Sequence, residues 1–179
     1  GIGEAKGKNK SRCKLAKAKD YGISEWDDHI PNKEVFDEIF RVSKNQIIFG
    51  GNYFVENLKN SPCWIVWDKN NSGDFADCEL AWTSFKTAVR KFKWTWNGMI
   101  QENMKNKEVR KHPTQKPIEL MRWCLENYSK EGDLVLDPFL GSGTTARACK
   151  DLKRDFIGFE ISKEYCEVAR DRLKQEVLF

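Results

Sequence analysis

Two acidic residues and two glycines stand where a nucleoside-binding site of an α/β protein needs them. Asp137 follows the short apolar run 134–136, and the turn Gly-Ser-Gly at 141–143 begins after three further residues. Glu160 follows a second apolar run, residues 156–159. In a strand–glycine loop–helix–strand unit, glycines let a ligand approach the backbone, and an acid after the second strand accepts hydrogen bonds from ribose hydroxyls. The pattern therefore indicates binding of an adenosine-type ligand.

The residues alone leave three interpretations of this pattern open. Residues 141–146 satisfy the G-x-G-x-x-A fingerprint of dinucleotide-binding proteins, but the carboxylate of Asp137 would repel a pyrophosphate at the end of the strand. The same carboxylate suits a ligand with a cationic end, such as the amino group and sulfonium of S-adenosylmethionine. In the third interpretation, Asp137 only caps the turn and the glycines only permit tight packing.

The apolar period predicts the elements that position these residues. A buried strand over 134–136 leads into the glycine turn, a helix spans 144–152, and a second strand spans 156–159. Ser162 is the expected cap of a final helix. Upstream, residues 118–128 show the spacing of an amphipathic helix that leads into the first strand. The order of elements predicts an α/β fold.

Three stretches together resemble a known family: His-Pro-Thr-Gln-Lys-Pro at 112–117, Asp-Pro-Phe-Leu-Gly-Ser-Gly-Thr-Thr at 137–145, and Phe-Ile-Gly-Phe-Glu at 156–160. They are similar to the permuted (class β) DNA amino-methyltransferases of restriction-modification systems. The resemblance implies transfer of a methyl group from S-adenosylmethionine to the 6-amino group of adenine or the 4-amino group of cytosine, with adenine favoured. It covers residues 111–173 almost continuously and is looser upstream.

The resemblance also implies a cofactor site at the glycine turn and at the loop 112–117. The residues that it assigns to S-adenosylmethionine are Asp137, Pro138, Phe139, Gly141, Ser142, Gly143, Thr144 and Glu160, with Thr114, Gln115 and Lys116 near the methionine end. Lys116 would pair with the carboxylate of the cofactor, and Asp137 would lie near its amino group. For His112 we expect a structural hydrogen bond within the loop, because nothing in the sequence positions it as a base.

The implied fold is one domain over residues 1–179, a doubly wound, Rossmann-like sheet that is mostly parallel with an antiparallel edge hairpin. Asp-Pro-Pro-Tyr, the catalytic tetrapeptide of the family, does not occur in the sequence, and Gly-Ile-Gly at 1–3 is similar to the turn that follows it. The tetrapeptide is expected just before Gly1, with the N-terminal strands missing, so no catalytic residue is assigned. A non-catalytic DNA-binding remnant, or one part of a split enzyme, is therefore an alternative. A nicotinamide-dependent enzyme is a further alternative.

Residues 112–179 are thus the expected cofactor-binding half. Upstream of them, the pattern predicts a helix capped by Asn32 and a buried strand at 46–49. Two further strands, at 62–67 and 78–82, are expected to form the antiparallel pair at the sheet edge. Residues 83–111 are rich in Lys, Arg, Trp, Asn and Gln, which is typical of the segment that recognises target DNA in this family. The stretch 91–96 is also compatible with a plain amphipathic strand.

Charge is distributed unevenly along the chain, whose formal net charge is +4. Residues 1–19 carry seven Lys/Arg against Glu4, a net +6, and residues 86–116 carry nine Lys/Arg against two Glu, a net +7, which leaves −9 elsewhere. Two basic segments on an acidic body favour double-stranded DNA as the partner. The candidate contacts are Lys8, Lys10, Arg12 and Lys14 in a basic mobile loop (1–29), and Lys91, Lys93, Trp94, Trp96 and Arg110.

Composition excludes several other classes of protein. Six cysteines without a C-x-x-C pair, together with two histidines, favour neither a zinc site nor a disulfide framework. No apolar run is long enough to cross a membrane. We therefore expect a cytoplasmic protein of bacterial or phage type that binds neither metal nor membrane, as a monomer or homodimer.

Overall fold

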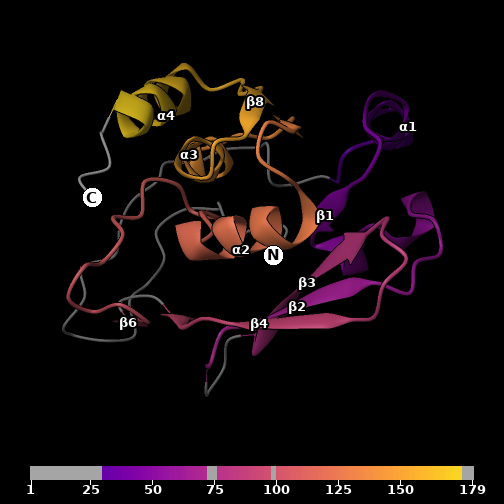
Figure 1. Cartoon of the computed structure of the whole chain (residues 1–179), viewed down its shortest axis with the longest axis horizontal. Helices are drawn as coiled ribbons and strands as arrows, with labels where there is room; N and C mark the ends of the chain where they lie inside the picture. Colours follow the sequence, from indigo (N-terminus) through magenta and orange to yellow (C-terminus); the bar gives the residue numbers. More distant parts are fainter. Residues whose placement is uncertain (1–29, 72–75, 98–99, 175–179) are drawn as a thin grey trace. The chain divides into compact units, whose positions relative to one another are not determined.

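The computed structural model of the chain describes residues 30–71, 76–97 and 100–174. The chain divides into two compact units, unit 1 up to Lys107 and unit 2 from Glu108 onward. Figure 1 labels their helices and strands. Among the described residues, no helix is both long enough and apolar enough to cross a membrane. The same residues contain no group of His, Cys, Asp and Glu that is arranged to hold a metal ion.

Unit 1 begins with helix α1, Lys33–Val42. The side-chain oxygen of Asn32 accepts a hydrogen bond from the backbone N–H of Val35 at 3.3 Å, so the predicted cap is confirmed. Phe36 is the buried residue of the helix. The ring of Phe40 meets the ring of Trp82 edge-on, with 5.8 Å between their centroids, and anchors α1 on the strands.

Four strands form the mixed sheet of unit 1, in the order β1-β3-β2-β4. Strands β1 (Ile47–Phe49) and β2 (Trp64–Asp68) each pair antiparallel with β3 (Cys78–Thr83), and β4 (Arg90–Lys93) pairs parallel with β2. The predicted antiparallel pair, β2 with β3, is confirmed. It lies inside this sheet rather than at its edge, because β4 adds a strand beyond β2.

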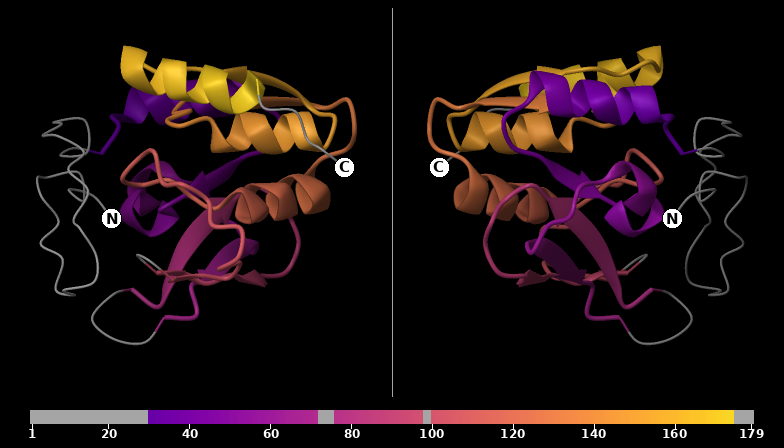
Figure 2. Two further views of the ribbon diagram at one scale, coloured as in Figure 1. Left: turned by 90° about the vertical axis from the view of Figure 1, so that its left-hand side faces the viewer. Right: turned by 90° about the vertical axis from the view of Figure 1, so that its right-hand side faces the viewer.

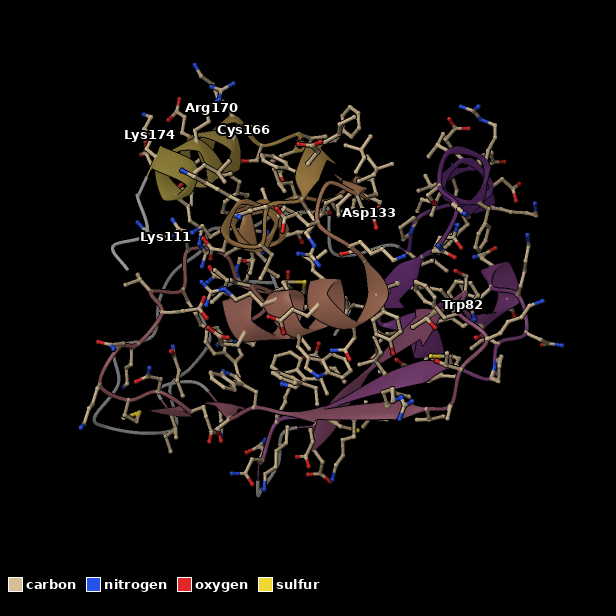
Figure 3. The ribbon with its side chains drawn as sticks, in the orientation of Figure 1. Trp82, Lys111, Asp133, Cys166, Arg170 and Lys174 are labelled. Carbon is tan, nitrogen blue, oxygen red and sulfur yellow. The ribbon has the colours of Figure 1, made fainter. Side chains whose placement is uncertain are left out.

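Tryptophans fill the core of unit 1. Trp67 and Trp82 are almost completely buried, and each indole N–H has a backbone acceptor, on Trp94 and Lys59 respectively. Figure 3 shows Trp82 among the side chains above the strands.

Two short 3-10 helices, η2 (Gly51–Tyr53) and η3 (Val55–Asn57), follow β1 in unit 1. The two-residue strands β5 (Trp96–Asn97) and β6 (Ile100–Gln101) pair antiparallel.

The part of unit 2 that the structure describes forms three helices and one pair of parallel strands. Its elements are α2 (Ile118–Tyr128), β7 (Leu134–Asp137), α3 (Thr144–Asp151), β8 (Asp155–Gly158) and α4 (Lys163–Lys174). β7 and β8 pair from Leu134 with Asp155 to Asp137 with Gly158. Figure 2 shows α3 between α2 and α4, and α3 is in contact with both. Every element predicted for this part of the chain is therefore present, within one or two residues.

Small side chains allow the close packing around α3. Ala146, Ala148 and Cys149 are buried on it. Burial raises the pKa of Cys149 to about 11, with a further contribution from the carboxylate of Asp137, and it raises the pKa of Cys124 on α2 to about 12. Both thiols are therefore protonated at neutral pH and pack as small apolar groups.

Candidate functional site

The glycine turn joins the end of β7 to the start of α3. Asp137 is the last residue of β7, and its Oδ1 accepts a hydrogen bond from the backbone N–H of Phe139 at 3.0 Å. The N–H of Leu140 donates to the carbonyl of Phe159 at 2.8 Å, which ties the loop to the chain that follows β8. Asp137 thus caps the turn, as one interpretation of the sequence held, and it also stands at the carboxyl end of a parallel strand, where ligands bind in open α/β sheets.

Glycine is required at position 143 for two separate reasons. Its φ of +78° lies in the left-handed region, which side chains of L-residues rarely adopt. A Cβ at this position would also lie 2.8 Å from the Cβ of Ala169 and 3.0 Å from its Cα, both on α4. Gly141 has a φ of +53°, and a Cβ added to it would lie 3.6 Å from the nearest atom of the His112 ring. The turn is therefore enclosed on one side by the protein itself.

Glu160 is held by backbone donors from two directions. Its Oε2 accepts a hydrogen bond from the N–H of Gly141 at 2.7 Å, and its Oε1 accepts one from the N–H of Ser162 at 2.8 Å. A carboxylate has about four acceptor positions, so each oxygen keeps a lone pair for a further donor. Two fixed donors also fix the plane of the carboxylate. The side chain that the sequence assigned to ribose binding is thereby oriented beside the glycine turn.

The loop 112–117 lies against the glycine turn. Gln115 is buried, and its Oε1 accepts hydrogen bonds from Ser142 Oγ at 3.1 Å and from the backbone N–H of Lys111 at 2.9 Å. His112 is buried with its ring 4.4 Å from the ring of Tyr165, and its Nδ1 accepts from the N–H of Thr114 at 3.2 Å. These contacts agree with the structural role expected for His112. The structure brings together the two segments that the sequence assigned to one site.

Apolar side chains are exposed next to the two carboxylates. Phe139 follows Asp137 and is 61% exposed, and Phe159 and Ile161 flank Glu160 and are 60% and 92% exposed. Carboxylates that accept hydrogen bonds, beside apolar side chains, suit a ligand with a diol and a flat apolar ring. Of the other assigned residues, Pro138, Thr114 and Lys116 are half-buried, and Thr144 is buried at the start of α3.

The candidate DNA contacts divide sharply by burial. Lys91 and Lys93 are exposed on β4, and Trp94 is half-buried with its ring stacked on Phe92, at 6.0 Å between centroids. Trp96 is only 4% exposed in β5, so its ring is part of the core and is not offered to a base. Arg110 is half-buried in unit 2. The candidates Lys8, Lys10, Arg12 and Lys14 lie outside the described residues.

Two charged residues of the site were missed by the sequence interpretation. Arg172 on α4 donates to Thr144 Oγ1 at 2.9 Å, and to Glu108 Oε2 at 3.0 Å. Neither residue belongs to a motif, and Glu108 and Arg172 stand 64 positions apart in the chain. Ile161 was also missed, because a residue after a strand-end acid carries no signal of its own. Helical periodicity placed Arg172 only on a helix and gave no indication of its partner.

A family of known proteins matches most of the chain. The profile of the DNA methylase family covers residues 8–171. The type II methyltransferase M2.DpnII of Streptococcus pneumoniae is 45% identical over 87 residues, which are 49% of this chain and 32% of the relative. M.HpaI of Haemophilus parainfluenzae is 52% identical over 71 residues, or 40% of this chain and 23% of the relative. The matched part is thus a third or less of the length of these relatives.

Solved structures agree with the family match. The M1.HpyAVI–SAM complex superposes with a TM-score of 0.57 and 32% identity, over 80% of this chain and 82% of that chain. TTHA0409 of Thermus thermophilus, complexed with S-adenosyl-L-methionine, has a TM-score of 0.54 and 19% identity over 78% and 73% of the two chains, a likeness of fold alone. The family profile and the M1.HpyAVI match each extend over most of the sequence, and the chain therefore belongs to the DNA methylase family.

Proposed function

We propose that this chain binds S-adenosylmethionine at the turn between β7 and α3, as the cofactor half of a DNA amino-methyltransferase. The methyl acceptor is the exocyclic amino group of a base, N6 of adenine in preference to N4 of cytosine. The observation that carries the proposal is the pair of strand-end carboxylates, Asp137 and Glu160, on either side of a glycine turn that Glu160 itself orients. The family match and the M1.HpyAVI–SAM complex support it.

The residues of the site fit this cofactor better than a dinucleotide. The carboxylate of Asp137 at the end of β7 disfavours a pyrophosphate and favours a ligand with a cationic amino group. Glu160 would accept hydrogen bonds from ribose hydroxyls with either ligand. Exposed Phe139, Phe159 and Ile161 offer apolar surface to an adenine ring. Phosphate-binding sites, by contrast, direct backbone N–H groups at the ligand, and here the N–H of Gly141 is used by Glu160.

This chain's own residues bind and orient the cofactor. When bound, the cofactor supplies an electrophilic methyl group on its sulfonium. Glu160 would hold the ribose hydroxyls as a fixed acceptor, Asp137 would hold the amino group, and Lys116 would pair with the carboxylate. Methyl transfer depends on alignment of the nucleophile with the methyl group more than on a strong base. These side chains therefore contribute to the rate of methyl transfer by orienting the cofactor.

The acceptor base must leave the duplex before its amino group can reach the cofactor. Lys91 and Lys93 project from the exposed strand β4 and are the proposed phosphate contacts of unit 1. Phosphate contacts position a protein on DNA without reading its sequence. Trp94, half-buried beside Phe92, is the remaining aromatic candidate for contact with a base.

Calorimetric titration tests the cofactor assignment directly. S-adenosylmethionine and NAD are each titrated into the wild-type protein and into Glu160→Gln. We expect S-adenosylmethionine to bind and NAD not to bind. The Glu160→Gln variant loses about tenfold or more in affinity, because an amide cannot accept from both N–H groups and the ribose as a carboxylate does. Asp133→Asn is the matched control, since Asp133 also accepts a backbone N–H, from Lys130, but at the other end of β7.

Binding of NAD without binding of S-adenosylmethionine would overturn the cofactor assignment and leave a nicotinamide enzyme as the better account. The acceptor is tested separately by incubation with methyl-labelled cofactor and duplex DNA. Mass spectrometry of the digested nucleosides should then show N6-methyladenine. A product with N4-methylcytosine alone would correct the choice of base, and cofactor binding without any transfer would favour a non-catalytic or split protein.

A further inference from the structure

One arginine, Arg172, contacts both segments that form the walls of the proposed cofactor site, the turn 142–144 and the segment 108–117. The Nη1 atom of Arg172 lies 2.9 Å from Thr144 Oγ1, and 3.4 Å from both the carbonyl oxygen and Oγ of Ser142. Ser142 and Thr144 flank Gly143, the residue with the left-handed backbone. Arg170, two positions earlier on the same helix, projects away from the protein instead (Figure 3). The inward arginine of α4 is therefore directed at the glycine turn.

The second amino group of Arg172 is bound to the other wall. Its Nη2 donates to Glu108 Oε2 at 3.0 Å, while Glu108 Oε1 accepts from the N–H of Ile118, the first residue of α2, at 2.8 Å. Glu108 thus fixes one end of the segment 108–117, which ends where α2 begins. Within that segment Gln115 Oε1 accepts from Ser142 Oγ. The two loops of the site are joined twice, once through Arg172 and once through Gln115.

Stability alone does not account for this ion pair. The side chains of Arg172 and Glu108 are 16% and 19% exposed. Burial raises the pKa of Glu108 and lowers the pKa of Arg172, in each case against the effect of the partner's charge. Desolvation therefore opposes the attraction between the two charges, and a buried ion pair is by itself weak evidence for stability. What a guanidinium adds is a planar fork with donors in fixed directions.

We infer that Arg172 is a positioning residue of the cofactor site, which holds the turn 142–144 in its binding conformation and couples it to the segment 108–117. The inference rests on the proposed function, because it assigns a role in binding the same cofactor. Arg172 acts through Ser142, Thr144 and Glu108. A small displacement of the turn would move the N–H of Gly141 away from Glu160. The carboxylate of Glu160 would then lose one of the donors that fix its orientation.

The test compares two arginines that are held by hydrogen bonds in the same unit. Arg172→Lys keeps the charge and loses the fork, and we expect the dissociation constant for S-adenosylmethionine to rise about tenfold. Arg154→Lys is the matched control: Arg154 donates to Ser129 and Leu152 at the ends of α2 and α3 and does not contact the turn. Its substitution should lower the melting temperature similarly and leave the dissociation constant unchanged. Thr144→Val, compared with Thr145→Val, removes the acceptor instead of the donor, and only the former should weaken binding.

Hydrogen exchange of the backbone amides at 141–144 gives a readout that does not depend on the cofactor. We expect faster exchange at these amides in Arg172→Lys than in the wild type, and no change in Arg154→Lys. Unchanged exchange in Arg172→Lys would show that Arg172 does not hold the turn. Equal losses of cofactor affinity in both arginine variants would show that its effect on binding is not specific to the turn. A wild-type protein that does not bind S-adenosylmethionine would instead contradict the proposed function, and exchange at 141–144 would then decide this inference alone.

Discussion

The two units hold their candidate functional side chains in opposite ways. In unit 2, the residues around the glycine turn are bound to one another by buried hydrogen bonds, with Gln115, Ser142 and Thr144 all below 9% exposure. In unit 1, the candidate contacts Lys91 and Lys93 stand on an exposed strand, while the buried part is a framework of tryptophans. A small ligand needs a site that is shaped in advance, whereas a phosphate backbone needs charge within reach. Substitutions should therefore have large, local effects in unit 2 and small, salt-dependent effects in unit 1.

The largest effect is expected for Gly143→Ala. The substitution forces an L-residue into a φ of +78° and places its methyl group against Ala169, so we expect a loss of about 2–5 kcal/mol in the free energy of unfolding. Gly132→Ala is the matched control, because Gly132 has a φ of +81° and no atom within 4 Å of the added Cβ. It should cost about 1–2 kcal/mol, the backbone part alone. Urea unfolding measures both, and equal losses would show that the contact with α4 is not tight.

The helices, strands and glycine turn of unit 2 could be predicted because local sequence patterns determine them. The backbone at 141 and 143 is left-handed, and glycine is the residue that adopts this conformation readily, so the Gly-Ser-Gly sequence itself indicates the turn. Asp137 and Glu160 are placed by the strands that precede them. Arg172 was not predictable, since its partners Glu108 and Thr144 are distant in the chain and any arginine on a helix has the same local pattern.

Unit 1 was less predictable because alternation does not say which face of a strand is covered. Trp94 and Trp96 appeared equivalent in the sequence, yet Trp96 is buried in the pair β5–β6 and Trp94 is half-buried beside Phe92. The strands at 62–67 and 78–82 were predicted to pair, but their central place in the sheet depends on β4, which the sequence offered only as an alternative.

A moderate effect on DNA binding is expected for the double variant Lys91→Gln, Lys93→Gln. If both side chains contact phosphates, the slope of log K against log salt concentration should fall by about one for each contact removed, with weaker binding to every sequence alike. The control is Lys33→Gln with Lys44→Gln, which removes the same charge elsewhere in unit 1. Equal losses in the two double variants would indicate attraction by net charge alone, and the difference between the two units would then be smaller than we describe.

The smallest effect is a pH dependence of stability that comes from one buried acid of unit 2, Glu108. Burial holds the pKa of Glu108 above its ordinary value of 4.5. The folded protein therefore binds this proton more tightly than the unfolded chain, so the stabilisation is present below pH 4.5 and is lost as pH rises through the raised pKa. Relative to Glu108→Gln, the wild type should lose unfolding free energy over that window in urea titrations. A difference between the two proteins that does not vary with pH would contradict the assignment.

The two amide donors on Glu160 also bear on how fast a ligand can bind. A carboxylate that is already oriented by Gly141 and Ser162 has no rotamers to search when the ligand arrives, so little entropy is lost in ordering it. Association should then be limited by the encounter rather than by rearrangement at this position. Nucleosides with and without a ribose hydroxyl should consequently enter at similar rates and differ in how long they stay.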